Sequence, residues 1–458
     1  MPDDHAARPA ERRSTRPVWA VATVVVLVGV GIIVIALTRD APQAAEGRPP
    51  APTTTSSPTS SPTASPTAEI EVELELERIP WEGGPQYWAS FAQASEWTDP
   101  SFFPIGIWHS GISSAEEVAW DTEHGINTYL GLWEGTDFSL FEEGGVYWIG
   151  GALNDTFDPA SPHWPGVVLD DEVDGRFSPE EGLAHLEELS ADAAGSGRFR
   201  YANFTQLVIG DDLDVDVQEK YVNAFTDAVS VDMYWYTIPF CDWRPYRGEA
   251  YAAPVPQEVC RTASSYGRTM DALTLRDAED GLLQPRWQFI ENLNGLSGHE
   301  HLGYISPEQL RGAAMSSIIN EARGLVWFNQ SFTGPCQSTN VIRTAQIEGD
   351  AWCGAPQVAA MGEVNRLIRD LAPVLNTQSY AWDFGDGLDT MLKIHDGHAY
   401  VFAMTDGTTG ERRFTLPPEI QGSTAEAIGG TGDRPIEDGA FTDVFANEHD
   451  YRIYRIAL

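Results

Sequence analysis

Basic residues are scarce in this sequence, which has 28 lysines and arginines against 68 aspartates and glutamates and a formal net charge of −40. The acidic residues are spread along the chain and do not gather in one tail. Nucleic acids and anionic lipids bind proteins through positive charge. The charge balance therefore excludes nucleic acid as a partner and argues against an anionic lipid surface as one.

Cysteine is also rare, and the four cysteines form no C-x-x-C pair, so no zinc site is predicted. Three pairings are possible. The pairing of sequence neighbours, Cys241 with Cys260 and Cys336 with Cys353, closes two loops and suits an oxidising compartment. Four free buried thiols are the alternative. The segment 210–219 alternates Asp but lacks the glycine that a calcium loop needs at its sixth position, so we expect it to begin a helix and predict no metal.

One uninterrupted apolar run occurs, at residues 18–37, and at ~1.5 Å per residue it spans a hydrocarbon core of ~30 Å. Four arginines precede the run and only Arg39 follows it closely, which places the N-terminus in the cytoplasm. We therefore expect a cytoplasmic tail (1–17), a transmembrane helix (18–38) that anchors the chain in the cell membrane, and extracellular domains after it. A cleaved secretory signal is the alternative.

Residues 39–78 are predicted to be a linker. Their first part is rich in Pro, Ser, Thr and Ala and offers no large apolar side chain to bury, so it should be an extended spacer. The last part, EIEVELELE (69–77), alternates acidic and apolar residues. That pattern fits either a peripheral strand or more linker.

From residue 79 to residue 375, short apolar runs alternate with amphipathic, helix-like segments, which is typical of βα units. The strand-like runs are 104–108, 126–133, 146–151, 167–171, 199–205, 230–237, 286–291 and 324–332. Eight such runs predict a (β/α)₈ TIM barrel. A doubly wound sheet is the alternative, but no glycine-rich nucleotide motif follows an early run, and we expect no cofactor.

After residue 376 the helical periodicity disappears. Short alternating runs follow one another, separated by Asp-Gly and Thr-Gly turns. We expect residues 376–458 to form a small antiparallel β-sandwich.

Function in such a barrel collects where the strands end, and polar and aromatic residues lie at these predicted ends. Aromatic faces stack on the C–H surfaces of sugars, while amides and carboxylates bond their hydroxyls. The candidate substrate-binding residues are Trp108, His109, Trp133, Asp170, Asp171, Asn203, Asp232, Tyr234, Tyr236, Trp327 and Asn329.

Two glutamates stand out among these positions. Glu172 follows the fourth run (VVLDDEVDG) and Glu291 ends the seventh (RWQFIENLNG). Cleavage of a glycosidic bond needs a proton donor for the leaving oxygen and a second carboxylate that faces the anomeric carbon. The sequence assigns Glu172 to the first role, with Asp171 as the alternative, and Glu291 to the second.

Neighbouring residues suit these roles. The aspartates beside Glu172, including Asp170, Asp171 and Asp174, should raise its pKa by repulsion between like charges. A tyrosine hydroxyl of the sixth run, Tyr234 or Tyr236, should bond and orient Glu291.

FFPIGIW (102–108), the two glutamates and ARGLVWFNQSF (322–332) together resemble the clan of retaining glycoside hydrolases that includes the β-galactosidase- and cellulase-like barrels. The resemblance implies a barrel with a C-terminal β-sandwich, Glu172 as acid/base, Glu291 as nucleophile and Trp327 lining the sugar site. One departure is Asp171, which stands where the clan has Asn, because an Asp donates a hydrogen bond only when it is protonated.

The sequence thus predicts a membrane-anchored extracellular glycoside hydrolase that cleaves a poly- or oligosaccharide by double displacement. The alternative is a non-catalytic barrel that binds a cell-envelope glycan or a surface protein. The Asp171 departure and the long spacer motivate this alternative.

Overall fold

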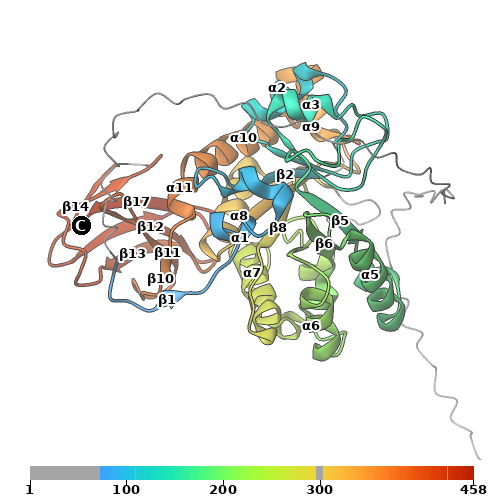
Figure 1. The fold of residues 1–458 in the computed structure, drawn as a ribbon. Helices are drawn as coiled ribbons and strands as arrows, with labels where there is room; N and C mark the ends of the chain where they lie inside the picture. The colour runs from blue at the N-terminus through green and yellow to red at the C-terminus, as the bar shows by residue number, and fades with distance from the viewer. Residues whose placement is uncertain (1–72, 109, 296–302, 431) are drawn as a thin grey trace, which may run out of the picture. The chain divides into compact units, whose positions relative to one another are not determined.

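The computed structural model describes residues 73–108, 110–295, 303–430 and 432–458 (Figure 1). The predicted cytoplasmic tail, the predicted transmembrane helix, most of the predicted linker and His109 lie outside these residues. None of the helices formed by the described residues combines the length and the apolar character that a membrane span requires.

Eight parallel strands close into a barrel in chain order, with β2 pairing with β9, which confirms the predicted TIM-barrel fold. The strands are β2 (Ile105–Trp108), β3 (Thr128–Leu130), β4 (Tyr147–Ile149), β5 (Gly166–Asp171), β6 (Phe199–Phe204), β7 (Ala228–Val231), β8 (Arg286–Glu291) and β9 (Gly324–Phe328). Glu172 and Glu291 therefore lie at the exits of the fourth and seventh barrel strands.

Helices alternate with the strands. They are α1 (Pro85–Trp88), α2 (Ala115–Glu123), α3 (Ser139–Gly144), α4 (Val173–Arg176), α5 (Pro179–Ala193), α6 (Val215–Asn223), α7 (Ser264–Asp277), α8 (Pro307–Ile319), α9 (Val341–Glu348), α10 (Ala355–Asp370) and α11 (Ala372–Leu375). Local sequence determines where helix α5 begins, because Ser178 and Glu181 form a capping box there. The 210–219 segment leads into α6, with Asp214 before its first residue, as expected.

Side chains that alternate along the strands fill the barrel. Trp287 of β8 lies 5.1 Å from Tyr201 of β6, ring centre to ring centre. Trp97, from the segment before β2, lies 6.2 Å from Trp287 and fills the end where the strands begin. Because strand side chains alternate, Phe289 and Glu291 point inward with Trp287.

The C-terminal part is antiparallel, with two layers that share one core, as predicted for a sandwich. A seven-stranded sheet has the order β1-β10-β11-β12-β17-β14-β15, and β13 pairs with β16 in a separate ribbon. The strands are β1 (Arg78–Ile79), β10 (Ser379–Tyr380), β11 (Leu388–His395), β12 (His398–Thr405), β13 (Gly410–Thr415), β14 (Thr424–Ala427), β15 (Arg434–Pro435), β16 (Ala440–Phe445) and β17 (Arg452–Ala457). The segment before residue 79 belongs partly to this sheet, through β1 and the buried Leu74.

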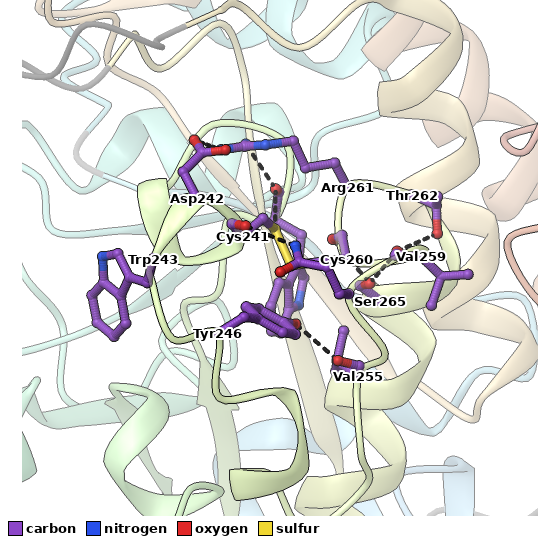
Figure 2. Close-up of a disulfide and its surroundings, with 12 residues drawn as sticks. Cys241, Asp242, Trp243, Tyr246, Val255, Val259, Cys260, Arg261, Thr262 and Ser265 are labelled. Carbon is purple, nitrogen blue, oxygen red and sulfur yellow. Dashed lines mark hydrogen bonds and ion pairs between the residues drawn. A yellow bond between two sulfur atoms is a disulfide. The ribbon is translucent and has the colours of Figure 1, made fainter.

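Two disulfides join Cys241 to Cys260 and Cys336 to Cys353, which confirms the predicted pairing. Figure 2 shows the first of these with its surroundings. It connects the segment after β7 to the segment that leads into α7.

Candidate active site

Glu291 is the last residue of β8, and no part of it is exposed to solvent. The Tyr266 hydroxyl donates to both carboxylate oxygens, at 2.8 Å to Oε1 and 2.7 Å to Oε2. Thr237 Oγ1 donates to Oε1 at 3.3 Å, and the main-chain N–H of Tyr236 bonds the same carboxyl. Burial raises the pKa of Glu291 to about 7, and these hydrogen bonds oppose that shift.

This arrangement corrects one prediction. The hydroxyl that orients Glu291 comes from Tyr266 on α7, and neither Tyr234 nor Tyr236 supplies it. The Tyr236 hydroxyl instead donates to Glu448, at 3.0 Å to each carboxylate oxygen. Tyr236 and Thr237, which follow β7, and Tyr266, in the first turn of α7, thus all donate hydrogen bonds to the Glu291 carboxyl.

Figure 2 shows how the Cys241–Cys260 disulfide fixes both of these segments. Arg261, next to Cys260, donates to the Tyr236 carbonyl at 2.9 Å and pairs with Asp242 at 2.5 Å. The Ser265 hydroxyl bonds the Cys260 carbonyl at 3.1 Å, one residue before Tyr266. The hydrogen-bond donors to Glu291 therefore lie on either side of a covalently closed loop, close to its two ends.

Glu172 follows β5 directly and has a left-handed backbone, with φ of 52°. Its main-chain N–H donates to the Asn203 carbonyl at 2.9 Å, and its carboxyl is hydrogen-bonded to Asp232, which follows β7. Burial and the charges of Glu172 and Asp171 raise the pKa of Asp232 well above its ordinary value. The Asp232–Glu172 pair therefore holds a proton at the rim of the barrel.

Two more aspartates beside Glu172 have raised pKa values. Burial raises the pKa of Asp171 to about 7, with a further contribution from the charge of Glu172. Burial also raises the pKa of Asp174 to about 6. Asp174 is held by Thr205, whose hydroxyl donates to it at 2.7 Å, so it serves the local structure.

Asp171 points into the barrel opening and is held by a chain of side chains. Asn203 Nδ2 donates to its Oδ1 at 2.8 Å, and the Ser230 hydroxyl donates to Asn203 Oδ1 at 2.7 Å. Asn203 and Ser230 are themselves buried. The predicted residues Asp171 and Asn203 thus form one hydrogen-bonded unit beside Glu172.

Tyr234, which follows β7, lies within electrostatic range of carboxyls that leave three barrel strands. Burial raises its pKa well above the ordinary value, and the charges of Asp232, Glu172, Asp171 and Glu291 add to the shift. The carboxyls at the exits of β5 and β8 therefore both lie within electrostatic range of one phenol.

Aromatic side chains lie at the same end of the barrel. Tyr234 and Phe328 lie 5.2 Å apart, ring centre to ring centre. Trp108, at the end of β2, makes an edge contact with Phe289 at 5.5 Å. Trp133, in the loop after β3, is 54 % exposed, which leaves its indole face open to solvent.

Trp327 does not line the opening, contrary to the prediction. It is fully buried, and its indole Nε1 donates to Asn365 of α10 at 2.9 Å, so it faces the helix layer. Alternation along β9 turns its neighbour Phe328 inward, in register with Glu291. Phe328 is thus the aromatic residue that β9 contributes to the opening.

Two further predicted site residues have structural partners instead. Asp170 pairs with Arg176 at 2.5 Å and with His185 of α5 at 2.8 Å. Asn329 bonds the Asn340 side chain and the Ile342 N–H, both at 2.9 Å, where α9 begins. Their polar atoms are engaged in holding helices and not in a sugar-binding surface.

The sequence reasoning missed Tyr266, Thr237 and Phe328. Tyr266 lies within a helix and is far along the sequence from any predicted strand end, so no pattern in the sequence singled it out. A backbone signal accompanies the site: Leu293 and Asn294, just after Glu291, have φ of 71° and 40°. Such left-handed non-glycine residues cluster at functional sites.

The described residues contain no group of three or more His, Cys, Asp or Glu side chains placed to bind a metal ion. The site contains two glutamates, aspartates with raised pKa values, tyrosine hydroxyls and aromatic rings. This set suits acid–base and nucleophilic chemistry on a polyhydroxylated ligand.

No protein-family model matches the chain, and no curated protein matches it. Solved structures that it resembles include a GH30 endoxylanase from Clostridium papyrosolvens C71 (9 % identity, TM-score 0.43, 78 % of this chain and 97 % of that chain covered). A family 5 glycoside hydrolase from Bacteroides vulgatus shares 12 % identity, with a TM-score of 0.44 and coverage of 78 % of this chain and 89 % of that one.

AmyP in complex with maltose is also similar, at 10 % identity and a TM-score of 0.40, with 80 % of this chain and 97 % of that chain covered. These structures are glycoside hydrolases by name or proteins that hold a sugar. At such identities and TM-scores they carry no argument about this chain. The strand pairing described above establishes its barrel without them.

Proposed function

We propose that this protein is a glycoside hydrolase that cleaves O-glycosidic bonds of a poly- or oligosaccharide by a retaining, double-displacement mechanism. The observation that supports the proposal is that Glu172 and Glu291 leave the fourth and seventh strands of one closed barrel at the same rim, within electrostatic range of the Tyr234 phenol. Glu291 is the nucleophile, and Glu172 is the acid/base. Aromatic side chains at the same end of the barrel suit a sugar.

The nucleophile must attack the anomeric carbon as a carboxylate. Glu291 has a pKa of about 7, so it is ionised above neutral pH and half-ionised near it. The Tyr266 hydroxyl stabilises the charged form and holds both oxygens in a fixed plane. The glycosyl ester that then forms on Glu291 is hydrolysed by a water molecule that Glu172 activates.

The leaving oxygen takes its proton from the Glu172–Asp232 pair. Glu172, hydrogen-bonded to Asp232, becomes a carboxylate when it protonates the leaving group, and the proton that it takes from the attacking water restores its acid form. Asp171 is protonated below pH 7 and so can donate a hydrogen bond to a substrate hydroxyl. A protonated Asp171 can thus donate the hydrogen bond that an Asn at this position would donate.

Replacing Glu291 by Gln tests the assignment, because Gln keeps the shape and cannot form the glycosyl ester. We expect the loss of turnover of aryl glycosides while the fold survives. Glu321→Gln is the matched control, since Glu321 is also buried but precedes β9, at the opposite end of the barrel. Parent-like turnover in Glu291→Gln would refute the nucleophile assignment.

Product stereochemistry and binding complete the test. A retaining enzyme releases the same anomer that it cleaves, and its two carboxyls lie about 5–5.5 Å apart. NMR of the first product shows the anomer. If the parent turns over no glycoside in a broad panel yet binds a cell-envelope glycan, the barrel is a binding module and the proposed chemistry is wrong.

We further propose that the enzyme is anchored in the cell membrane by residues 18–38 and acts outside the cell. The uninterrupted apolar run, the arginines before it and the two disulfides support this location. Protease treatment of intact cells should remove the activity from the surface. Activity that stays protected inside cells would contradict the proposal.

A further inference from the structure

The helix that carries Tyr266 lacks a cap of its own. α7 begins after Ala263, whose side chain cannot accept a hydrogen bond, and the first turn contains no acidic residue. The positive end of the helix dipole at such a start favours a carboxylate. Glu448, from the loop between β16 and β17, supplies one: its Oε2 accepts from the Ala263 N–H at 2.8 Å.

The same carboxylate also holds Tyr236. The buried Tyr236 hydroxyl donates to Glu448 at 3.0 Å from each oxygen. The main-chain N–H of Tyr236 bonds the Tyr266 hydroxyl at 3.3 Å, and the two rings lie 5.6 Å apart. Glu448 therefore fixes both the start of α7 and the residue packed against Tyr266.

The contacts of Glu448 with the start of α7 and with Tyr236 both lead to the Glu291 carboxyl. Tyr266 is the third residue of α7, so its position follows the start of the helix that Glu448 caps. Tyr266 donates to both oxygens of Glu291, and the Tyr236 N–H reaches the same carboxyl. A side chain of the C-terminal sheet region thus holds two hydrogen-bond donors of the proposed nucleophile.

We propose that Glu448 is a positioning residue for Glu291, through which the C-terminal β-structure keeps the nucleophile aligned for attack. The inference rests on the proposed function. The C-terminal region then acts in catalysis itself, in addition to covering part of the barrel. A purely structural Glu448 would stabilise the contact between the two regions and leave Glu291 unaffected.

Glu448→Ala in the full-length protein tests the proposal, with Glu426→Ala as the matched control. Glu426 is a glutamate of the same C-terminal region, in β14, but it is exposed and pairs with Arg455 at 2.6 Å. We expect Glu448→Ala to lower kcat roughly 10- to 100-fold with little change in KM, because small misalignments of a reacting group carry that cost. Glu448→Gln keeps one acceptor oxygen and should retain more activity than Glu448→Ala.

A second measurement does not depend on turnover. The carboxyl carbon of Glu291, assigned in ¹³C NMR by its loss in Glu291→Gln, reports the titration of that group directly. If Glu448→Ala loosens Tyr266, Glu291 loses part of a hydrogen bond to its charged form, so its titration midpoint should move to higher pH. The midpoint in Glu426→Ala should match that of the parent.

The outcomes separate the two proposals. If Glu448→Ala matches Glu426→Ala in both kcat and the Glu291 midpoint, the positioning role is overturned and the hydrolase proposal stands. If the midpoint moves but the parent cleaves no glycoside, the link stands and the hydrolase proposal falls. Should Glu448→Ala fail to fold, Tyr236→Phe removes only the hydroxyl, and parent-like kcat and midpoint in that variant overturn the role.

Discussion

Replacing Tyr266 by Phe probes the proposed nucleophile most directly. The change removes one hydroxyl, which donates to both oxygens of the buried Glu291, and keeps the ring that packs against Tyr236. The bond stabilises the ionised carboxyl more than the protonated one, so its loss raises the pKa of Glu291 above the present value of about 7.

The size of the effect follows from the strength of such bonds. A hydrogen bond to a charged group contributes about 1.5–3 kcal/mol, and one pKa unit corresponds to about 1.4 kcal/mol. The acidic limb of the kcat/KM profile should therefore move up by roughly one to two pH units. At pH 6 the variant should retain roughly a tenth to a hundredth of the parent kcat/KM, and part of the loss should be recovered above pH 8.

The assay is kcat/KM for an aryl glycoside from pH 5 to pH 9. Tyr87→Phe is the control, because its hydroxyl bonds the Asp227 carbonyl just before β7, at the far end of the barrel. Its acidic limb should coincide with that of the parent. An unchanged limb in Tyr266→Phe, with the variant folded, would refute the claim that this phenol governs the charge of Glu291.

The same geometry supports three more tests. Trp327→Phe should leave kcat/KM nearly unchanged and lower the free energy of unfolding in denaturant by about 1–3 kcal/mol, because it loses the hydrogen bond to Asn365 outside the barrel. Phe328→Ala, by contrast, should lower kcat/KM. The reverse pattern would show that Trp327 belongs to the site. Asp171→Asn cannot lose a proton, so its kcat/KM should fall less than that of the parent as the pH rises through about 7; parallel profiles would contradict the donor role of Asp171. Folding raises the pKa of Glu291 from 4.5 to about 7, so the contribution of this group to the free energy of unfolding is present below pH 4.5 and is lost as the pH rises through 7. The loss amounts to roughly 3 kcal/mol. The free energy of unfolding of Glu291→Gln, measured over this pH range, should lack this decrease.

Much of the fold could be predicted because its causes are local. Runs of apolar residues that alternate with amphipathic segments produce parallel strands and helices, and the eight runs form the eight barrel strands. Parallel strands in a closed barrel all end at one rim, so Glu172 and Glu291 had to lie at the same rim once their strands were counted. The disulfide pairing followed from the positions of four cysteines.

The direction of side chains at strand ends could not be predicted. A shift of one residue turns a side chain from the barrel interior to the helix layer. Trp327 and Phe328 are adjacent, and only the pairing of β9 with β8 shows which of them faces inward. The pairing of β5 with β6 also shifts its register between Val168 and Asp171, so counting along the sequence does not give the direction of Asp170 and Asp171.

The sequence by itself therefore determined the architecture and the placement of two acidic residues at one rim of the barrel, because periodicity and strand order are properties of neighbouring residues. The tertiary structure alone decided what surrounds them. Tyr266 comes from a helix, and Glu448 comes from a strand connection near the end of the chain. Packing brings these groups to Glu291, and no spacing in the sequence encodes that distance.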